Sequence, residues 1–265
     1  MTPILRITLL YSLVPVLFTV VGAAAGAFVP DMARIRNSVL HLAAGVVFAV
    51  VAVELLPEIM RRALVGDVVI GFALGIATML AADKVIDRIR GDDDDNGDHL
   101  VATDAREQVP AVSVSPATRV SVSASLFVAV AIDFLLDGLL LGVGFAAGAR
   151  IGILLALAEA AEQLSVGLAL AGELTAAGMS RARVLLIVSA LGSLVFVTAV
   201  LGATVLGGLS DGTMEIVLSF GAAALLYLVT NELLREAHEE RESAFATAMF
   251  FVGFLMFLIV GMTLG

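Results

Sequence analysis

The sequence predicts an all-α integral membrane protein with eight transmembrane helices. Of its 265 residues, 60% are hydrophobic and 15% are charged, whereas roughly one quarter of the residues in soluble domains are charged. Apolar runs of about 20 residues or more recur along the chain, which is the length that a helix needs to cross the hydrocarbon core. In lipid each run must satisfy its own backbone hydrogen bonds, and these runs are too long and too continuously apolar for barrel strands.

The composition also excludes several kinds of function. Cysteine is absent, so thiolate metal ligands, disulfides and thiol chemistry are excluded. The net charge of −10 disfavours a nucleic-acid partner. No Ser or Thr nucleophile is paired with a general base and no metalloprotease motif occurs, so an enzyme is not expected and no prosthetic group is implied.

Eight spans follow from the apolar runs that lie between clusters of charged and turn residues. They cover residues 4–28, 38–60, 65–86, 120–148, 151–177, 182–207, 213–235 and 244–264. We therefore divide the chain into residues 1–86 with three spans, 87–119, 120–177 with spans four and five, and 178–265 with the last three. Segment 87–119 is rich in Asp, Ser, Thr and Pro, so we expect an acidic, flexible loop there.

The distribution of basic residues predicts the orientation in the membrane. Eight spans place both termini on the same side. With both termini outside, eleven Lys and Arg residues lie in cytoplasmic connections and four lie outside. This asymmetry satisfies the positive-inside rule. We expect a multi-pass protein of the cell membrane, inner or plasma, with the acidic loop in the cytoplasm.

Two distant segments share a motif and its surroundings. The sequence ELLPE at residues 54–58 recurs as ELLRE at residues 232–236, an offset of 178 residues. The same offset carries the first span onto the sixth and the third onto the eighth. Corresponding spans are five apart in order, so the second copy crosses the membrane in the opposite direction. The pattern predicts an inverted repeat, which is typical of secondary transporters with a substrate site near the midplane.

Spans four and five each carry two acidic residues within the membrane. Asp133 and Asp137 are four residues apart, and Glu159 and Glu162 are three apart, so each pair lies on one helix face. Asp137 and Glu162 are equally distant from the turn at residues 149–150, about 19 Å along each helix. We therefore expect them at one depth, near the middle of the membrane, with all four carboxylates converging on one ion.

Carboxylates at the centre of a bilayer must be neutralised, because even one charged residue there costs on the order of 3 kcal/mol. Neither span contains Lys, Arg or His. The neutralising species is then a divalent cation, which we favour, or protons, either along a proton path or in carboxyl groups hydrogen-bonded between helices. Oxygen ligands suit harder ions such as Mn²⁺, Mg²⁺ or Ca²⁺, whereas Zn²⁺ sites usually include imidazole or thiolate.

Other ionisable residues are expected away from this cluster. Three histidines are expected in solvated or interfacial positions: His41, His99 and His238. Four glutamates near the span ends are interpreted as wet interfacial residues or as relay sites at the entrance and exit: Glu54, Glu58, Glu232 and Glu236.

The chain resembles the ZIP (Zrt-, Irt-like protein) family of divalent metal transporters. The eight spans, the 3+2+3 arrangement, the long cytoplasmic loop and the ELLPE segment are all similar to that family. Its fourth-span motif, His-Asn-x-Pro-Glu-Gly, aligns with residues 133–138, and its fifth-span acidic pattern aligns with residues 159–163. The resemblance implies that Zn²⁺, Mn²⁺, Fe²⁺ or a similar ion moves toward the cytoplasm.

The resemblance also implies an assembly and a mode of movement. Spans one, four, five and six would form a moving transport unit, as in an elevator, and spans two, three, seven and eight a scaffold that often forms a homodimer. Four glycines would permit close helix approach and sliding: Gly138, Gly142, Gly144 and Gly167.

The ligands are implied residue by residue. Asp133 stands in place of the family's His, Asp137 in place of its Glu, and Glu162 is retained. Glu159 replaces a ligand that is usually Asp or His. Only a single-ion site is implied, because residues of a different kind stand at two ligand positions of binuclear members, and both motif prolines are missing as well. These substituted positions are Phe134 and Ser193, and Leu136 and Ala161.

Two other functions are left open by the residues. One is a proton-coupled carrier of a small solute, in which the carboxylates titrate and no metal binds. The other is a non-transporting, metal-sensing membrane protein, which the substituted family positions favour.

Overall fold

A computed structural model describes residues 3–29, 33–62, 64–97, 124–233 and 244–264. Every regular element in these ranges is a helix, which confirms the predicted all-α class. Seven spans in the described part are long and apolar enough to cross a membrane. A shorter apolar helical stretch, Thr247–Thr263, lies where the eighth span is predicted, so the structure is consistent with eight crossings.

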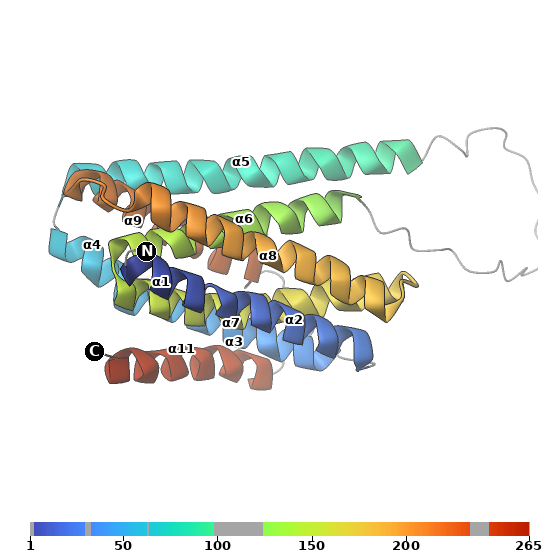
Figure 1. Cartoon of the computed structure of the whole chain (residues 1–265). Coiled ribbons are helices and arrows are strands. Elements are labelled where there is room, and N and C mark those ends of the chain that lie inside the picture. The colour runs from blue at the N-terminus through green and yellow to red at the C-terminus, as the bar shows by residue number, and fades with distance from the viewer. Residues whose placement is uncertain (1–2, 30–32, 63, 98–123, 234–243, 265) are drawn as a thin grey trace, which may run out of the picture.

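The helices follow the predicted spans closely. In order they are α1 (Pro3–Tyr11) with α2 (Leu13–Phe28), α3 (Ala33–Val50) with η1 (Val51–Leu55) and α4 (Leu56–Arg62), α5 (Val65–Gly97), α6 (Ala124–Ala147), α7 (Ala149–Ala176), α8 (Arg181–Leu206), α9 (Asp211–Tyr227) with η2 (Leu228–Leu233), and α11 (Ala244–Leu264). Figure 1 shows them as a bundle of roughly aligned helices, with both ends of the chain toward the same end of the bundle. That arrangement agrees with an even number of crossings.

Helix α5 is longer than the predicted span. It continues to Gly97 and takes in residues 87–97, which we expected to belong to the flexible loop. No proline interrupts the chain between Val65 and Gly97, and the membrane boundary does not itself end a helix, because charged residues are good helix formers in water. The loop prediction is therefore corrected for residues 87–97, and residues 98–123 lie outside the described part.

Short turns connect the helices in the second half of the chain. Gly178 and Gly208 have φ angles of 85° and 96°. This left-handed conformation suits glycine and follows the ends of α7 and α8. Ser210 then caps α9, its side chain accepting a hydrogen bond of 3.4 Å from the backbone N–H of Thr213. Such tight turns make α7, α8 and α9 antiparallel neighbours in sequence.

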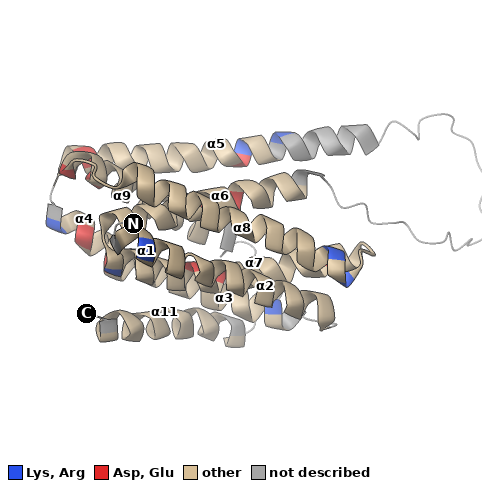
Figure 2. Cartoon of the chain, viewed as in Figure 1, with Lys and Arg blue, Asp and Glu red and all other residues tan. Residues whose placement is uncertain are grey.

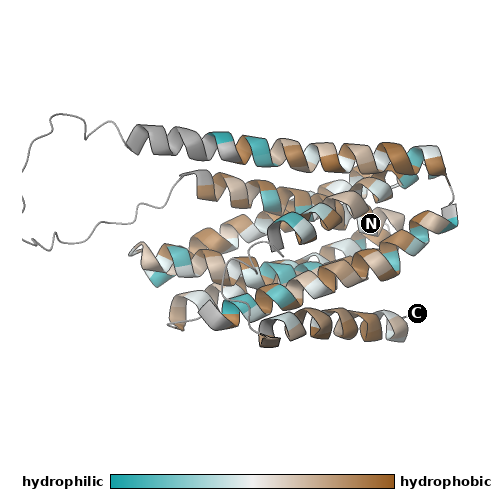
Figure 3. Ribbon diagram, turned by 180° about the vertical axis from the view of Figure 1, so that it is seen from behind, coloured by the Kyte–Doolittle hydropathy of each residue, from teal (hydrophilic) through white to brown (hydrophobic). Residues whose placement is uncertain are grey.

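The helices pack in pairs through glycine contacts. Helix α2 lies against α7 and α8, α6 against α8, α5 against α9, and α3 against both α11 and α7. A Cβ added to any of the four predicted packing glycines would meet atoms of another helix, which confirms close approach at Gly138, Gly142, Gly144 and Gly167. Figure 3 shows hydrophobic residues over most of the helix surfaces, as expected for a bundle surrounded by lipid.

Two features recur at the offset of 178 residues. Helix η1 covers residues 51–55, and η2 covers the offset positions 229–233. Gly75 of α5 lies against the carbonyl of Phe220 in α9, and Gly253 of α11 lies against the carbonyl of Leu42 in α3. Adding 178 to Gly75 and Leu42 gives Gly253 and Phe220. Two copies of one unit would share these contacts, and the inverted repeat stays a prediction that they favour.

Candidate metal centre

Three of the four predicted carboxylates come together. Asp133 and Asp137 of α6 and Glu162 of α7 each present a carboxylate oxygen, and these oxygens lie within 4.8 Å of one another. Asp137 and Glu162 are both 1% exposed, and Asp133 is half-buried. Figure 2 shows acidic positions within the middle of the bundle around α6 and α7, whereas basic positions lie toward the helix ends.

The α6–α7 hairpin explains why these residues meet. Only Gly148 separates the end of α6 from the start of α7, so the two helices run antiparallel. Asp137 and Glu162 are similarly far from this turn, and their side chains do meet, as predicted from the helical rise. Asp133 precedes Asp137 by one turn and lies on the same face of α6.

Glu159 is buried but does not belong to this group of three. It is 1% exposed, and neither of its carboxylate oxygens has a hydrogen-bond partner among the described residues. Glu159 lies one turn closer to Gly148 than Glu162 does, and at that level α6 carries Leu140 and Leu141 instead of an acidic residue. Convergence of all four carboxylates was thus predicted, and the group contains three.

Gln163 is a component of the centre that the sequence reasoning missed. Its amide nitrogen donates a hydrogen bond of 2.8 Å to Oδ2 of Asp137. Its amide oxygen accepts a hydrogen bond of 2.9 Å from the hydroxyl of Thr19 in α2. Gln163 and Thr19 are both 0% exposed. One signal could have found Gln163: it is the sole amide side chain in spans four and five.

The positions that differ from the family pattern contribute no ligand of the family's kind. Phe134 is fully buried in the hydrophobic core. Ser193 is exposed on α8, and its hydroxyl donates a hydrogen bond of 2.6 Å to the carbonyl of Ala190 in its own helix. Helices α6 and α7 run through Leu136 and Ala161, where the motif prolines are missing, without a break in helical structure.

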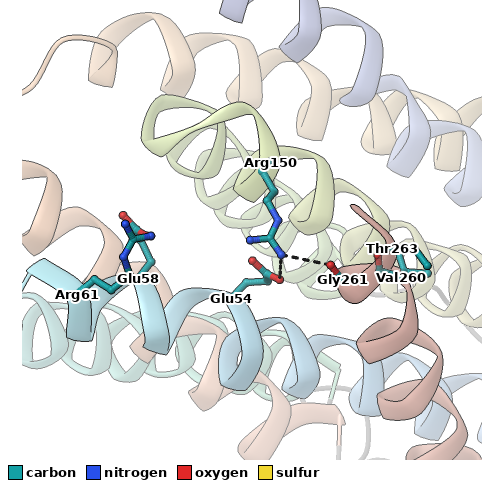
Figure 4. Close-up of polar contacts among 7 residues, drawn as sticks. All are labelled: Glu54, Glu58, Arg61, Arg150, Val260, Gly261 and Thr263. Carbon is teal, nitrogen blue, oxygen red and sulfur yellow. Dashed lines mark hydrogen bonds and ion pairs between the residues drawn. The ribbon is translucent and has the colours of Figure 1, made fainter. Parts of the chain in front are cut away.

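Glu54 differs from the interfacial residue that was expected. Its side chain is 6% exposed and accepts a hydrogen bond of 3.0 Å from Nη2 of Arg150 at the start of α7. The same nitrogen donates to the carbonyl of Gly261 in α11 at 3.3 Å, as Figure 4 shows. Arg150 therefore ties Glu54 into a contact of three helices. Glu58 pairs with Arg61 at 3.3 Å near the helix end.

His41 is also not solvated. It is 4% exposed, and its Nδ1 lies 2.9 Å from the carbonyl of Asn37 one turn earlier in α3. A carbonyl can only accept, so Nδ1 carries the proton. This local hydrogen bond lets an imidazole be buried in an apolar helix, a situation that hydropathy does not reveal. Three expected sites lie outside what the structure describes: His99, His238 and Glu236, together with the side chain of Glu232.

A second polar cluster, also missed from the sequence, joins α5 to α9 and η2. Asn231 donates hydrogen bonds to Asp83 at 3.1 Å and to the hydroxyl of Tyr227 at 2.9 Å. Tyr227 donates its own hydrogen to Asp83. The three side chains satisfy one another, so this cluster is interpreted as a link between helices.

Together, the fold and the centre define a multi-pass helical membrane protein with a buried carboxylate site suited to a cation. The model of the ZIP zinc transporter family matches residues 87–261, which is 175 of the 265 residues. The chain therefore belongs to the ZIP family and is a metal transporter by family, not an enzyme. Among curated proteins, no relative matches it.

Proposed function

We propose that this protein carries a divalent metal cation, Zn²⁺, Mn²⁺, Fe²⁺ or a similar ion, across the membrane toward the cytoplasm. The observation that carries the proposal is the group of Asp133, Asp137 and Glu162, whose oxygens lie within 4.8 Å of one another in the interior of the bundle. Carboxylates this close repel one another unless positive charge or protons lie among them. A divalent cation supplies that charge at one point.

The surroundings suggest how an ion is held and exchanged. Asp137 and Glu162 are buried and form the central pair, whereas Asp133 is half-buried and marks the side on which ions enter or leave. Glu159, one turn from Glu162, is proposed as a fourth ligand once an ion draws the carboxylates together. Metal binding would displace protons from the group, so we expect uptake to weaken as pH falls.

The orientation and assembly belong to the same proposal. Both termini face the outside of the inner or plasma membrane, the protein forms a homodimer, and spans one, four, five and six move against the remaining spans. The position of both chain ends at one end of the bundle and the contacts repeated at the offset of 178 residues support this arrangement. Tags at either terminus that are labelled only after intact spheroplasts are opened would contradict the orientation.

A non-transporting metal sensor is the second candidate. The uninterrupted helices α6 and α7 favour it, because the kinks that the family's prolines provide are absent. Family membership favours transport instead, and it equally disfavours a carrier of small organic solutes. These functions differ in whether metal crosses the membrane, so one assay separates them.

The test is metal uptake into liposomes that contain the purified protein. Mn²⁺, Fe²⁺, Zn²⁺, Co²⁺, Cd²⁺ and Mg²⁺ would be added outside one at a time, with a metal-sensitive dye trapped inside and Asp137→Ala liposomes as the control. We expect saturable uptake of at least one of these ions by the wild-type protein and none by the variant. Tight binding without uptake would support a sensor, and absence of both would reject the proposal.

A further inference from the structure

We propose that Gln163 is a positioning residue of the cation site, which restricts Asp137 to binding an ion through a single oxygen. The inference rests on the proposed function and adds a selectivity to it: small divalent ions such as Co²⁺, Zn²⁺ and Mn²⁺ are favoured over Ca²⁺. Gln163 follows Glu162 in α7 and bonds to Asp137 on α6, so it contacts one ligand directly and adjoins the other in sequence.

The hydrogen bonds fix the orientation of the Gln163 amide. A carboxylate oxygen can only accept, so the amide nitrogen faces Oδ2 of Asp137 at 2.8 Å. The amide oxygen then faces the hydroxyl of Thr19 at 2.9 Å. That hydroxyl also lies 3.0 Å from the carbonyl of Pro15, which the helical N–H of Thr19 already serves. Its single hydrogen is therefore available to Gln163.

Helix packing holds this chain of hydrogen bonds in place. Gly167, one turn after Gln163, lies against the carbonyl of Thr19, and Gly22 of α2 lies against the carbonyl of Leu164. A Cβ at either glycine would overlap backbone atoms and push α2 away from α7. The glycines thus bring Thr19 within reach of Gln163, and both side chains are completely buried.

The consequence for Asp137 is a loss of coordinating capacity. With Oδ2 engaged by an amide N–H in a buried place, Oδ1 is the oxygen that Asp137 presents to an ion. Ca²⁺ takes about six to eight oxygen ligands and often uses bidentate carboxylates, whereas Zn²⁺ is commonly satisfied by about four donors. A few carboxylates that each bind through one oxygen suit the smaller ion.

The experiment measures Co²⁺ and Ca²⁺ affinity by calorimetry on the purified full-length protein, together with the visible absorption of bound Co²⁺. Gln163→Leu keeps a buried side chain of similar size without the amide. We expect it to weaken Co²⁺ binding by about 10- to 100-fold, the effect typical of residues that orient metal ligands. Ca²⁺ should weaken much less, so the ratio of the two affinities falls, and the Co²⁺ spectrum should change.

Thr19 provides a second, independent variant and a matched control. Thr19→Val removes the hydroxyl that holds the amide and should move both affinities in the same direction by a smaller factor, whereas Thr19→Ser should restore wild-type values. Thr8→Val is the control, because Thr8 is equally buried and also bonds the carbonyl four residues earlier, at 3.0 Å from Ile4, with no printed bond to another helix.

The outcomes separate this inference from the proposed function. A wild-type Co²⁺ to Ca²⁺ ratio and spectrum in both Gln163→Leu and Thr19→Val would overturn the inference while leaving a metal site in place. Should Gln163→Leu fail to fold, the Thr19→Val and Thr19→Ser pair decides alone. Equal binding of Co²⁺ by the wild-type protein and by Asp137→Ala would instead remove the cation site itself.

Discussion

Two buried carboxylates in the membrane-spanning part of this protein have opposite surroundings. Glu54 is bonded at 3.0 Å by Arg150, a permanent cation from another helix. Asp137 is bonded at 2.8 Å by the neutral amide of Gln163 and lies beside two further carboxylates. Glu54 is therefore neutralised by a fixed partner, while the group around Asp137 concentrates negative charge in spans that contain no basic residue.

The difference separates a structural site from a transport site. A carboxylate paired with a guanidinium is complete without any ligand, and it holds two helices together. A group of three carboxylates, by contrast, is stable in lipid only with protons or a cation among them, and either can leave. Acidic residues within a membrane protein thus indicate transport when their counter-charge is mobile, and packing when it is fixed.

The largest expected effect comes from removing a member of the central pair. Asp137→Ala or Glu162→Ala should weaken divalent metal binding by more than about 100-fold, beyond the loss caused by residues that only orient ligands. The folded protein should be at least as stable in detergent, because mutually repelling buried charge has been removed. Calorimetry and thermal unfolding of the same samples measure both quantities.

Glu54→Gln is the matched control for this prediction, since it also removes a buried carboxylate. It should leave metal affinity unchanged. Equal metal affinity in the wild-type protein and in both central variants would reject the central site, whatever the fold does.

The outer pair should respond in stability instead. Arg150→Met keeps the apolar stem but leaves Glu54 buried without its charge partner, and we expect a loss of about 2 kcal/mol. That is less than for a fully buried pair, because the Arg150 side chain is 52% exposed. Glu54→Gln should cost less than about 1 kcal/mol, since Arg150 keeps access to water.

Arg61→Met provides the comparison for Arg150→Met, because the Arg61 side chain is 81% exposed and pairs with Glu58 within one helix. It should change stability by less than about 1 kcal/mol. If Arg150→Met instead lost metal affinity and kept its stability, the outer pair would belong to the transport path and the comparison between the two sites would fail.

Much of the fold could be predicted from the sequence because lipid imposes a simple rule. Apolar length alone predicts a membrane helix, so the predicted span at 244–264 matches α11. The extension of α5 to Gly97 could not be found in this way, because outside the membrane hydropathy no longer distinguishes a helix from a loop.

The site was predictable to the extent that it depends on helical spacing. Asp133, Asp137 and Glu162 meet because spacing and a tight turn determine their faces and depths. The contacts of Gln163 with Thr19 and of Arg150 with Glu54 join residues 144 and 96 positions apart. They depend on which helices pack together, and no local pattern encodes that.

The smallest expected effect tests whether the oxygen-only character of the centre determines its ion preference. Asp133→His would introduce a nitrogen ligand at the one half-buried position of the group, where a change of side chain disturbs packing least. Imidazole is a softer donor than carboxylate and suits Zn²⁺ better than Mn²⁺. We expect the ratio of Zn²⁺ to Mn²⁺ affinity to rise about tenfold, a difference of about 1.4 kcal/mol, and to decline on acidification, because only neutral imidazole binds metal. Competition calorimetry would measure the ratio, with Asp133→Asn, which keeps an oxygen donor without imidazole, as the control. The same ratio in the His and Asn variants would show that Asp133 does not contact the ion, and that the preference is determined by Asp137 and Glu162 alone.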